Sequence, residues 1–89
     1  MPWDHLTEAD IARIQQLCDA ATPGPWKAYV EDRDHESGSS FIQTGGADIE
    51  LSGASIADYD FIANARQDVP RLVREVRYLR DALAKAMGQ

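Results

Sequence analysis

The sequence contains one cysteine, two histidines and no apolar run that approaches the roughly 20 residues of a membrane-spanning helix. Because Cys18 has no second cysteine to pair with, an internal disulfide is excluded. The helical pattern around Cys18 favours a small core residue over a nucleophile. Zinc sites draw on several His and Cys ligands, which this chain does not supply together. We therefore expect one small domain without metal or cofactor, located by default in the cytoplasm.

Positive charge is also scarce, since nine Lys and Arg side chains against 15 Asp and Glu give a net charge of -6. General binding to the phosphate backbone of DNA or RNA needs clustered positive charge, so this balance argues against it. Six of the nine basic side chains lie in residues 57–89, which leaves room for a local cationic surface on the C-terminal helix.

The first helix is predicted at about residues 8–20. Thr7 is a good N-cap, and Asp10 follows three residues later, as the carboxylate of a capping box does. Leu6 and Ile11 match the two partners of a hydrophobic staple. Apolar residues then repeat at helical spacing as far as the end of the predicted helix.

The segment "TPGPW", Thr22 to Trp26, follows this helix. Its two prolines restrict the residues before them, so the turn is stiff in the unfolded chain as well. Trp26 has the inward-facing parity of the strand that it opens. We interpret Trp26 as a structural anchor between the helix and the sheet; the alternative is an exposed tryptophan that stacks on a ligand.

The middle of the chain is predicted to form a β-meander. Gly45 and Gly46 suit a two-residue hairpin turn, which would make Ile42 face Ile49 on the buried side of the sheet. The three antiparallel strands are expected at about residues 26–31, 39–44 and 47–52.

The other face of this sheet would carry Tyr29 and Phe41, with Lys27 and Gln43 beside them. Aromatic side chains on the solvent parity have two interpretations. A partner chain or the C-terminal helix covers them, or they form a stacking platform for a flat ring with a cation nearby.

The last third of the chain is predicted to be helical with one break. Pro70 cannot donate a hydrogen bond inside a helix, and Asp68 is a plausible N-cap before it. We expect a short helix at about 57–65 and a long helix at about 69–86. Apolar residues of the long helix step by three and four, which is the pattern of a heptad seam about 2.5 repeats long. The residues of this heptad seam are Val69, Leu72, Val76, Leu79, Leu83 and Ala86.

Three uses of the heptad seam stay open. It packs on the sheet of its own chain, pairs with a second copy, or does both at different depths. A chain of 89 residues buries too little surface for a wide stability margin, so we expect a homo-oligomer, most simply a dimer. The expected fold class is α+β, with the helices packed on the meander.

The loop at residues 31–40 is the densest polar stretch. Its side chains do not match a calcium loop, because glycine and glutamate are missing from the sixth and twelfth positions. A Ser-His-Asp set within so polar a segment arises by chance, so we assign no catalytic residue. The loop is a solvated turn, or it contacts an anionic ligand through Arg33, His35, Ser37 and Ser39. Because four acidic residues surround this one arginine, such a ligand would also need cations of the last helix. The candidates are Arg66 and Arg71, from the same or a neighbouring subunit.

Two separated motifs resemble a known family. "ATPGPW" at 21–26 and "DYDFIANARQDVPRLVREVRYLR" at 58–80 are similar to small phage and prophage proteins of the ead-like early-region type. The middle stretch "DRDHESGSSFIQTG" is not part of that pattern. The resemblance implies an accessory phage gene product acting in the bacterial host, and no enzyme activity that can be carried to particular residues.

Three classes of function follow, in order of preference. The first is a non-enzymatic protein that sequesters a small anionic, nucleotide-like ligand, as an anti-defence sponge would. The second is a protein–protein inhibitor or regulator of a host factor. The third is a small nucleotide-processing hydrolase that uses His35.

Overall fold

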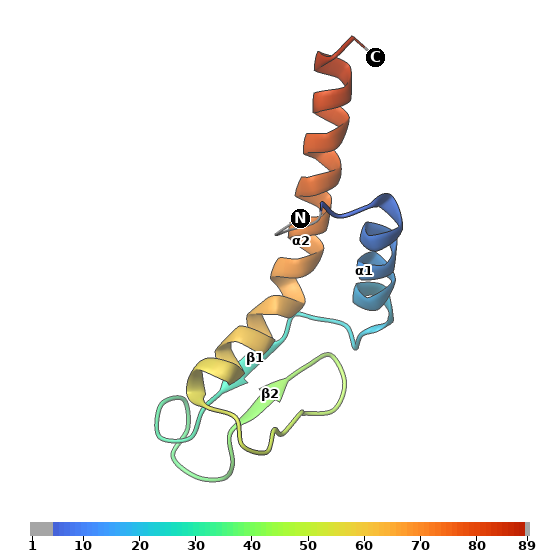
Figure 1. Ribbon diagram of the computed structural model, residues 1–89. Coiled ribbons are helices and arrows are strands. Elements are labelled where there is room, and N and C mark those ends of the chain that lie inside the picture. Colours follow the sequence, from blue (N-terminus) through green and yellow to red (C-terminus); the bar gives the residue numbers. More distant parts are fainter. Residues whose placement is uncertain (1–4, 89) are drawn as a thin grey trace. The chain divides into compact units, whose positions relative to one another are not determined.

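The computed structural model describes residues 5–88, which form two helices and two strands in the order α1, β1, β2, α2 (Figure 1). Their bounds are Glu8–Ala20 for α1, Lys27–Tyr29 for β1, Phe41–Gln43 for β2 and Ile56–Ala86 for α2. The chain divides into two compact units. One is Thr22–Asp68, and the other combines the chain up to Ala21 with the chain from Val69. The expected α+β class is confirmed in this general form.

Helix α1 begins with the capping box that the sequence predicts. The Thr7 hydroxyl accepts the backbone N–H of Asp10 at 3.0 Å, and the Asp10 carboxylate accepts the backbone N–H of Thr7 at 2.9 Å. These bonds satisfy two donors that the first turn of a helix otherwise leaves without partners, and they hold the pKa of Asp10 below its usual value. Ile11, the staple residue, is buried. The predicted helix and its start are both confirmed.

The small core of the unit Thr22–Asp68 lies where β1 and β2 meet the first turns of α2. The strands are antiparallel, with Ala28 opposite Ile42 and Tyr29 opposite Phe41. Buried side chains of both strands cluster with buried residues of α2, and partly buried apolar residues pack around them. The cluster consists of Ala28, Val30, Ile42, Tyr59 and Ala63, surrounded by Trp26, Ile49, Leu51, Ala54 and Ile62.

The third strand of the expected meander is not formed. Ile42 and Ile49 do face one another and exchange two backbone hydrogen bonds of 2.8 and 2.9 Å, but this is an isolated bridge. The reason is the hydroxyl of Tyr59, which occupies the place where Ser40 and Leu51 would pair. It accepts the Leu51 N–H at 3.1 Å and lies 3.2 Å from the carbonyl oxygens of both Ser40 and Leu51. A side chain of α2 therefore replaces one rung of the predicted ladder.

The glycine turn is tied to the "TPGPW" segment. The backbone N–H of Gly45 donates to the carbonyl of Pro23 at 2.8 Å. A Cβ atom added to Gly45 would lie 2.7 Å from that oxygen, so only glycine fits so close an approach. The hydroxyl of Thr44 completes the turn, since it accepts the Gly46 N–H and donates to the carbonyl of Ala47.

The "TPGPW" segment is also bound to α2. Gln67 accepts the Trp26 N–H at 2.6 Å and donates its amide to the Trp26 carbonyl at 3.2 Å. The carbonyl of Thr22 receives the indole N–H of Trp26 at 3.0 Å and the Nε–H of Arg66 at 2.9 Å. The rigid turn thus holds its backbone groups against one stretch of helix and against the glycine turn.

The predicted break before Pro70 is wrong, because α2 runs without interruption from Ile56 to Ala86 with Pro70 inside it. A proline removes one intrahelical hydrogen bond and crowds the preceding turn. Residues 65–67 and 71–75 on either side include strong helix formers. Their helix propensity outweighs the free energy lost at Pro70, so the helix is not interrupted. The boundary between the two compact units nevertheless falls at Asp68 and Val69.

Candidate functional site

Arg33 in the polar loop is bound to two carboxylates. Its guanidinium makes a two-pronged contact with Asp60 of α2, at 2.9 and 3.0 Å, and two contacts with Asp34, at 3.0 and 2.8 Å. These hydrogen bonds hold the pKa of both carboxyl groups below the usual range. An anionic ligand at Arg33 would have to compete with both aspartates, which already neutralise the guanidinium.

The rest of the loop is folded on itself. Asp32 has a φ of 67°, and its N–H donates to the carbonyl of His35 at 2.7 Å. The Glu31 N–H donates to the hydroxyl of Ser40 at 3.0 Å. The imidazole Nδ1 of His35 lies 2.6 Å from the carbonyl oxygen of Ser37. These contacts describe an ordered turn, with Ser37 and Ser39 exposed on it.

The outer face of the sheet carries a continuous stack. The rings of Tyr29 and Phe41 lie 5.2 Å apart with an interplanar angle of 17°. The Lys27 ammonium is 5.1 Å from the centre of the Tyr29 ring, and the His35 ring is 5.7 Å from that of Phe41. Both aromatic rings therefore have a second neighbour from their own chain. A flat ligand that stacks on either ring would compete with Lys27 or His35.

His35 has one polar atom without a hydrogen-bond partner among the residues that the structure describes. Its Nε2 is enclosed, whereas Nδ1 faces the Ser37 carbonyl. With the proton on Nδ1, Nε2 is an acceptor that a donor would satisfy. This is the one feature of the loop that favours a ligand.

Arg66, one of the two arginines expected to complete a ligand site, is bound elsewhere in the unit Thr22–Asp68. Within the unit Thr22–Asp68, Arg33 binds Asp60, whereas Arg66 binds the carbonyl of Thr22. Asp60 and Arg66 are six residues apart on α2, which is about 9 Å along the helix axis. Arg71 belongs to the other unit.

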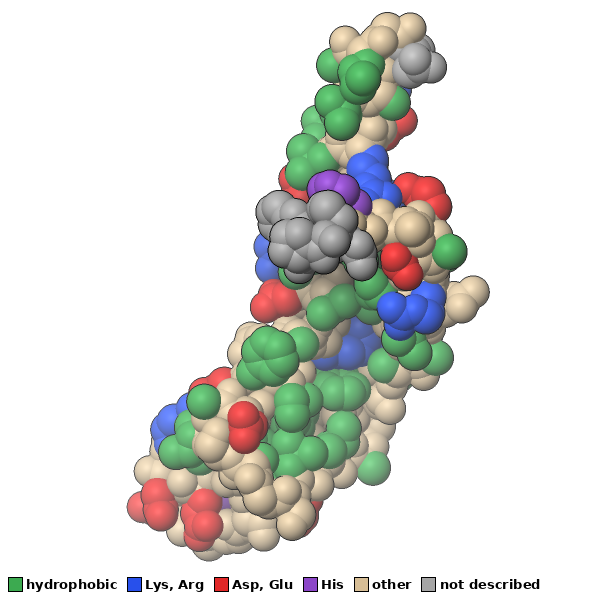
Figure 2. Space-filling model, viewed as in Figure 1, with side chains coloured by type: hydrophobic (Ala, Val, Ile, Leu, Met, Phe, Trp, Pro, Cys, Tyr) green, Lys and Arg blue, Asp and Glu red, His purple; other side chains and the backbone are tan. Residues whose placement is uncertain are grey.

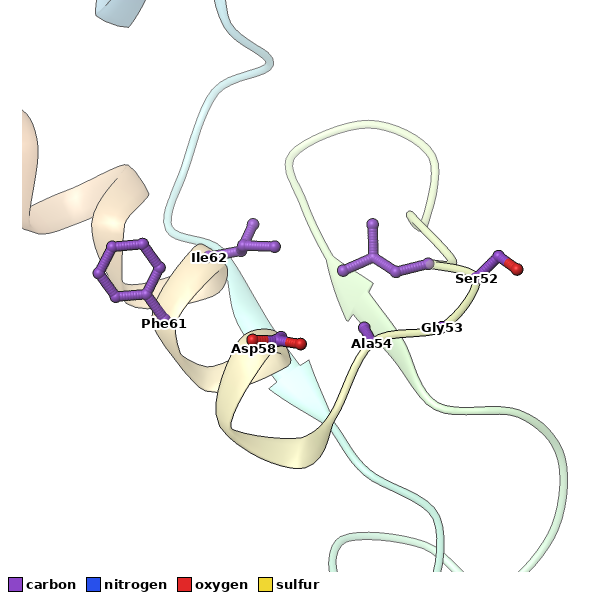
Figure 3. Close-up of a pocket in the computed structure, with 7 residues that line it drawn as sticks. Ser52, Gly53, Ala54, Asp58, Phe61 and Ile62 are labelled. Atoms are coloured by element: carbon purple, nitrogen blue, oxygen red, sulfur yellow. The ribbon is translucent and has the colours of Figure 1, made fainter.

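A shallow apolar hollow of about 450 Å³ lies between the start of α2 and the loop before it. Ile62 projects from α2 towards this loop, which contains Ser52, Gly53 and Ala54 (Figure 3). The Asp58 carboxylate accepts the Ser55 N–H at 2.9 Å and is therefore engaged in capping α2. The lining is mainly apolar, with Ser52 and the capping Asp58 as its polar side chains, so we assign the hollow no function.

Several exposed apolar side chains lie on the C-terminal part of α2, where Figure 2 shows hydrophobic side chains following the helix. Leu72, Leu79 and Leu83 of the heptad seam are 61%, 54% and 60% exposed. The seam valines Val69 and Val76 are half-buried. Contacts within their own compact unit therefore leave the three seam leucines uncovered, and packing of the seam on the sheet stays a prediction.

Helix α1 is attached beside this surface, in the same compact unit. The Arg80 guanidinium donates to the carboxylate of Glu8 at 3.0 Å and to the Leu6 carbonyl at 2.6 Å. Ile11 and Val73 are buried in this unit. Helix α1 thus contacts α2 through Arg80 and leaves Leu72, Leu79 and Leu83 exposed to solvent.

Several residues that organise these sites were not identified from the sequence. Tyr59, Asp60 and Gln67 each join α2 to a segment far away in the chain. The only signal was their position in the helical motif "DYDFIANARQ". Nothing in the sequence indicates which loop a polar side chain of that helix will meet.

Two kinds of feature have no candidate among the described residues. Among residues 5–88, no group of three His, Cys, Asp or Glu side chains is arranged to hold a metal ion. Within the same range, no helix combines the length and apolarity needed to cross a membrane.

No protein-family model matches the chain, and no significant match is found among curated proteins or solved structures.

Proposed function

We propose that this protein is a non-enzymatic binding protein that acts as a homo-oligomer assembled through the heptad seam of α2. The observation that carries the proposal is the exposure of Leu72, Leu79 and Leu83, each more than half open to solvent at coiled-coil spacing. The resemblance to ead-like proteins supports the wider role of an accessory phage or prophage product in a bacterial cell.

The energetic reason is the apolar surface that these leucines leave in water. Full burial of a leucine side chain is worth about 1.5–3 kcal/mol. Three leucines on one helix face, each more than half exposed, form a contiguous apolar patch of the kind that marks an interaction site. A second copy of the chain offers the same pattern of side chains, because an interface with twofold symmetry is self-complementary.

Binding of a small anionic ligand remains the alternative function. The enclosed Nε2 of His35 favours it, whereas the pairing of Arg33 with Asp34 and Asp60 weighs against it. Occupation of the seam by a host protein is a further alternative, because the same leucines would serve that purpose.

The test is the oligomeric state of Leu79→Asp. Light scattering at micromolar concentration should give at least twice the 9.9 kDa chain mass for the unaltered protein and 9.9 kDa for the variant. Because Leu79 is 54% exposed in the single chain, the variant should keep its helix content by circular dichroism. Tyr78→Asp is the matched control: it introduces the same charge on the neighbouring residue, which is 67% exposed and lies off the seam, and it should leave the oligomer intact.

A monomer for the unaltered protein would refute self-association. In that case, a higher melting temperature in the presence of cyclic or linear nucleotides would favour the ligand-binding alternative. A monomer that no nucleotide stabilises would favour a host protein as the occupant of the seam.

A further inference from the structure

We infer that the heptad seam pairs with a second copy of this chain as a parallel, in-register, two-stranded coiled coil. The inference rests on the self-association proposed above and adds its orientation and register. It is carried by the identity of the seam residues and by the charges on either side of them.

The seam residues of the first two heptads match the preference of parallel dimers. In heptad notation the core positions a and d face the partner helix. β-Branched residues at a, combined with leucine at d, favour two parallel strands. The a positions are Val69, Val76 and Leu83, and the d positions are Leu72, Leu79 and Ala86.

The flanking charges are complementary in the parallel arrangement. Glu75 occupies a g position and Arg80 the following e position. In a parallel, in-register pair each g side chain lies beside the e' side chain five residues later on the other helix. Glu75 of each chain would therefore lie beside Arg80 of the other, which gives two opposite-charge pairs across the interface.

Antiparallel pairing lacks this match. With every a residue opposite a d' residue over residues 69–86, Glu75 would lie beside Ala82 and Arg80 beside Val73 of the other copy. If one helix of the antiparallel pair is shifted along the other by seven residues in one direction, the two Arg80 side chains meet. A shift in the opposite direction brings the two Glu75 side chains together. Each shift also reduces the number of apolar a and d residues that face one another. Only the parallel, in-register pair joins opposite charges, and like charges oppose the shifted antiparallel registers.

The contacts within the chain are compatible with this pair. Arg80 is 38% exposed while it binds Glu8, so its guanidinium is still accessible to a further carboxylate. In the dimer each Arg80 would lie between Glu8 of its own helix α1 and Glu75 of the other copy. Helix α1 would then flank the coiled coil on its e side without covering the d leucines, as the exposure of these leucines in the single chain requires.

Disulfide cross-linking tests the orientation. In a Cys18→Ala background, Ala86→Cys places one thiol at a d position near the end of the seam. In a parallel dimer the two thiols face one another, within reach of a disulfide, which needs a Cβ–Cβ distance of about 4 Å. In the antiparallel dimer residue 86 faces residue 69, so the two copies of residue 86 are 17 residues apart along the axis, or about 25 Å.

We expect mild oxidation of Ala86→Cys to give a covalent dimer. The matched control Lys85→Cys, one residue away on the outer face of the same turn, should stay a monomer on a non-reducing gel. If instead Ala86→Cys fails to cross-link while its mixture with Val69→Cys does, the pairing is antiparallel and the inference is overturned. If the Cys18→Ala background itself is a monomer in light scattering, self-association fails, and with it both proposals.

A charge-swap experiment gives an independent readout that needs no cysteine. Glu75→Arg and Arg80→Glu should each self-associate severalfold more weakly than the parent, because each places like charges across both flanks. Their equimolar mixture should form a heterodimer, since both flanks then carry opposite charges. A mixture that associates no better than either variant alone would overturn the parallel, in-register arrangement.

Discussion

The hydroxyl of Tyr59 offers the sharpest test of how the unit Thr22–Asp68 is held together. Tyr59 is 6% exposed, and its hydroxyl contacts the Leu51 N–H and the carbonyls of Ser40 and Leu51. Replacement of Tyr59 by Phe removes this oxygen and keeps the ring, so it creates no large cavity. The free energy of unfolding should therefore fall only through the hydrogen bonds of this hydroxyl, which link Ser40 and Leu51 where the third strand was expected.

The expected magnitude follows from these contacts. Removing one partner of a buried hydrogen bond costs about 1–3 kcal/mol, because the remaining donor or acceptor stays desolvated. Tyr59→Phe leaves the Leu51 N–H without its acceptor, and it removes the single hydroxyl proton that one of the two carbonyls accepts. We expect a loss of about 2 kcal/mol in the free energy of unfolding. For a chain of this size, about 2 kcal/mol corresponds to a fall in melting temperature of roughly 8–16 °C.

The assay is urea denaturation followed by far-ultraviolet circular dichroism, at one fixed protein concentration because association would add to the apparent stability. Tyr78→Phe is the matched control, since Tyr78 lies on the same helix with a side chain 67% exposed. Its stability should stay within about 0.5 kcal/mol of the parent. Equal stability of Tyr59→Phe and Tyr78→Phe would refute the bridging role of the hydroxyl.

Two further predictions concern polar contacts of the same unit. Gln67→Ala should lower the free energy of unfolding by about 1–2 kcal/mol in the same urea assay, because it removes the amide that bonds both backbone groups of the "TPGPW" tryptophan. An equal effect of the exposed control Gln43→Ala would contradict this. The pKa values of Asp34 and Asp60 are lowered by Arg33, so the stability they contribute is fully present above their ordinary pKa of about 3.9 and is lost as the pH falls through the lowered values. Melting temperature should therefore fall below about pH 4, with a shallower fall in Arg33→Ala; identical slopes would show that the ion pairs add nothing.

The features predicted correctly from the sequence are local. The capping box needs only Thr7 and Asp10, three residues apart, and the facing of Ile42 and Ile49 needs only a turn of two glycines between them. Such features depend on backbone geometry within a few residues, so they can be predicted from the neighbouring residues alone. The same holds for the parity that buries Ala28 and exposes Lys27.

The features that were missed depend on partners far away in the chain. The third strand is replaced by a hydroxyl from Tyr59, and the loop arginine Arg33 is neutralised by Asp60, 27 residues later. Neither partner can be identified from periodicity, because an outward polar residue of a helix looks the same whether it meets water or a loop. The helix break before Pro70 was expected from a local rule, and strong helix formers on both sides outweighed it.

The two compact units differ in how far their own chain covers their apolar side chains, and this difference is a physical reason for the proposed self-association. The unit Thr22–Asp68 has a cluster of five buried apolar residues, closed by side-chain hydrogen bonds from α2. In the described part of the other unit only Ile11 and Val73 are buried, while Leu17 and the seam leucines are more than half exposed. A long helix whose apolar face has so little cover gains most of its stability from packing rather than from helix propensity. A second copy would supply that packing, so association would add to the stability that this unit already has in the single chain.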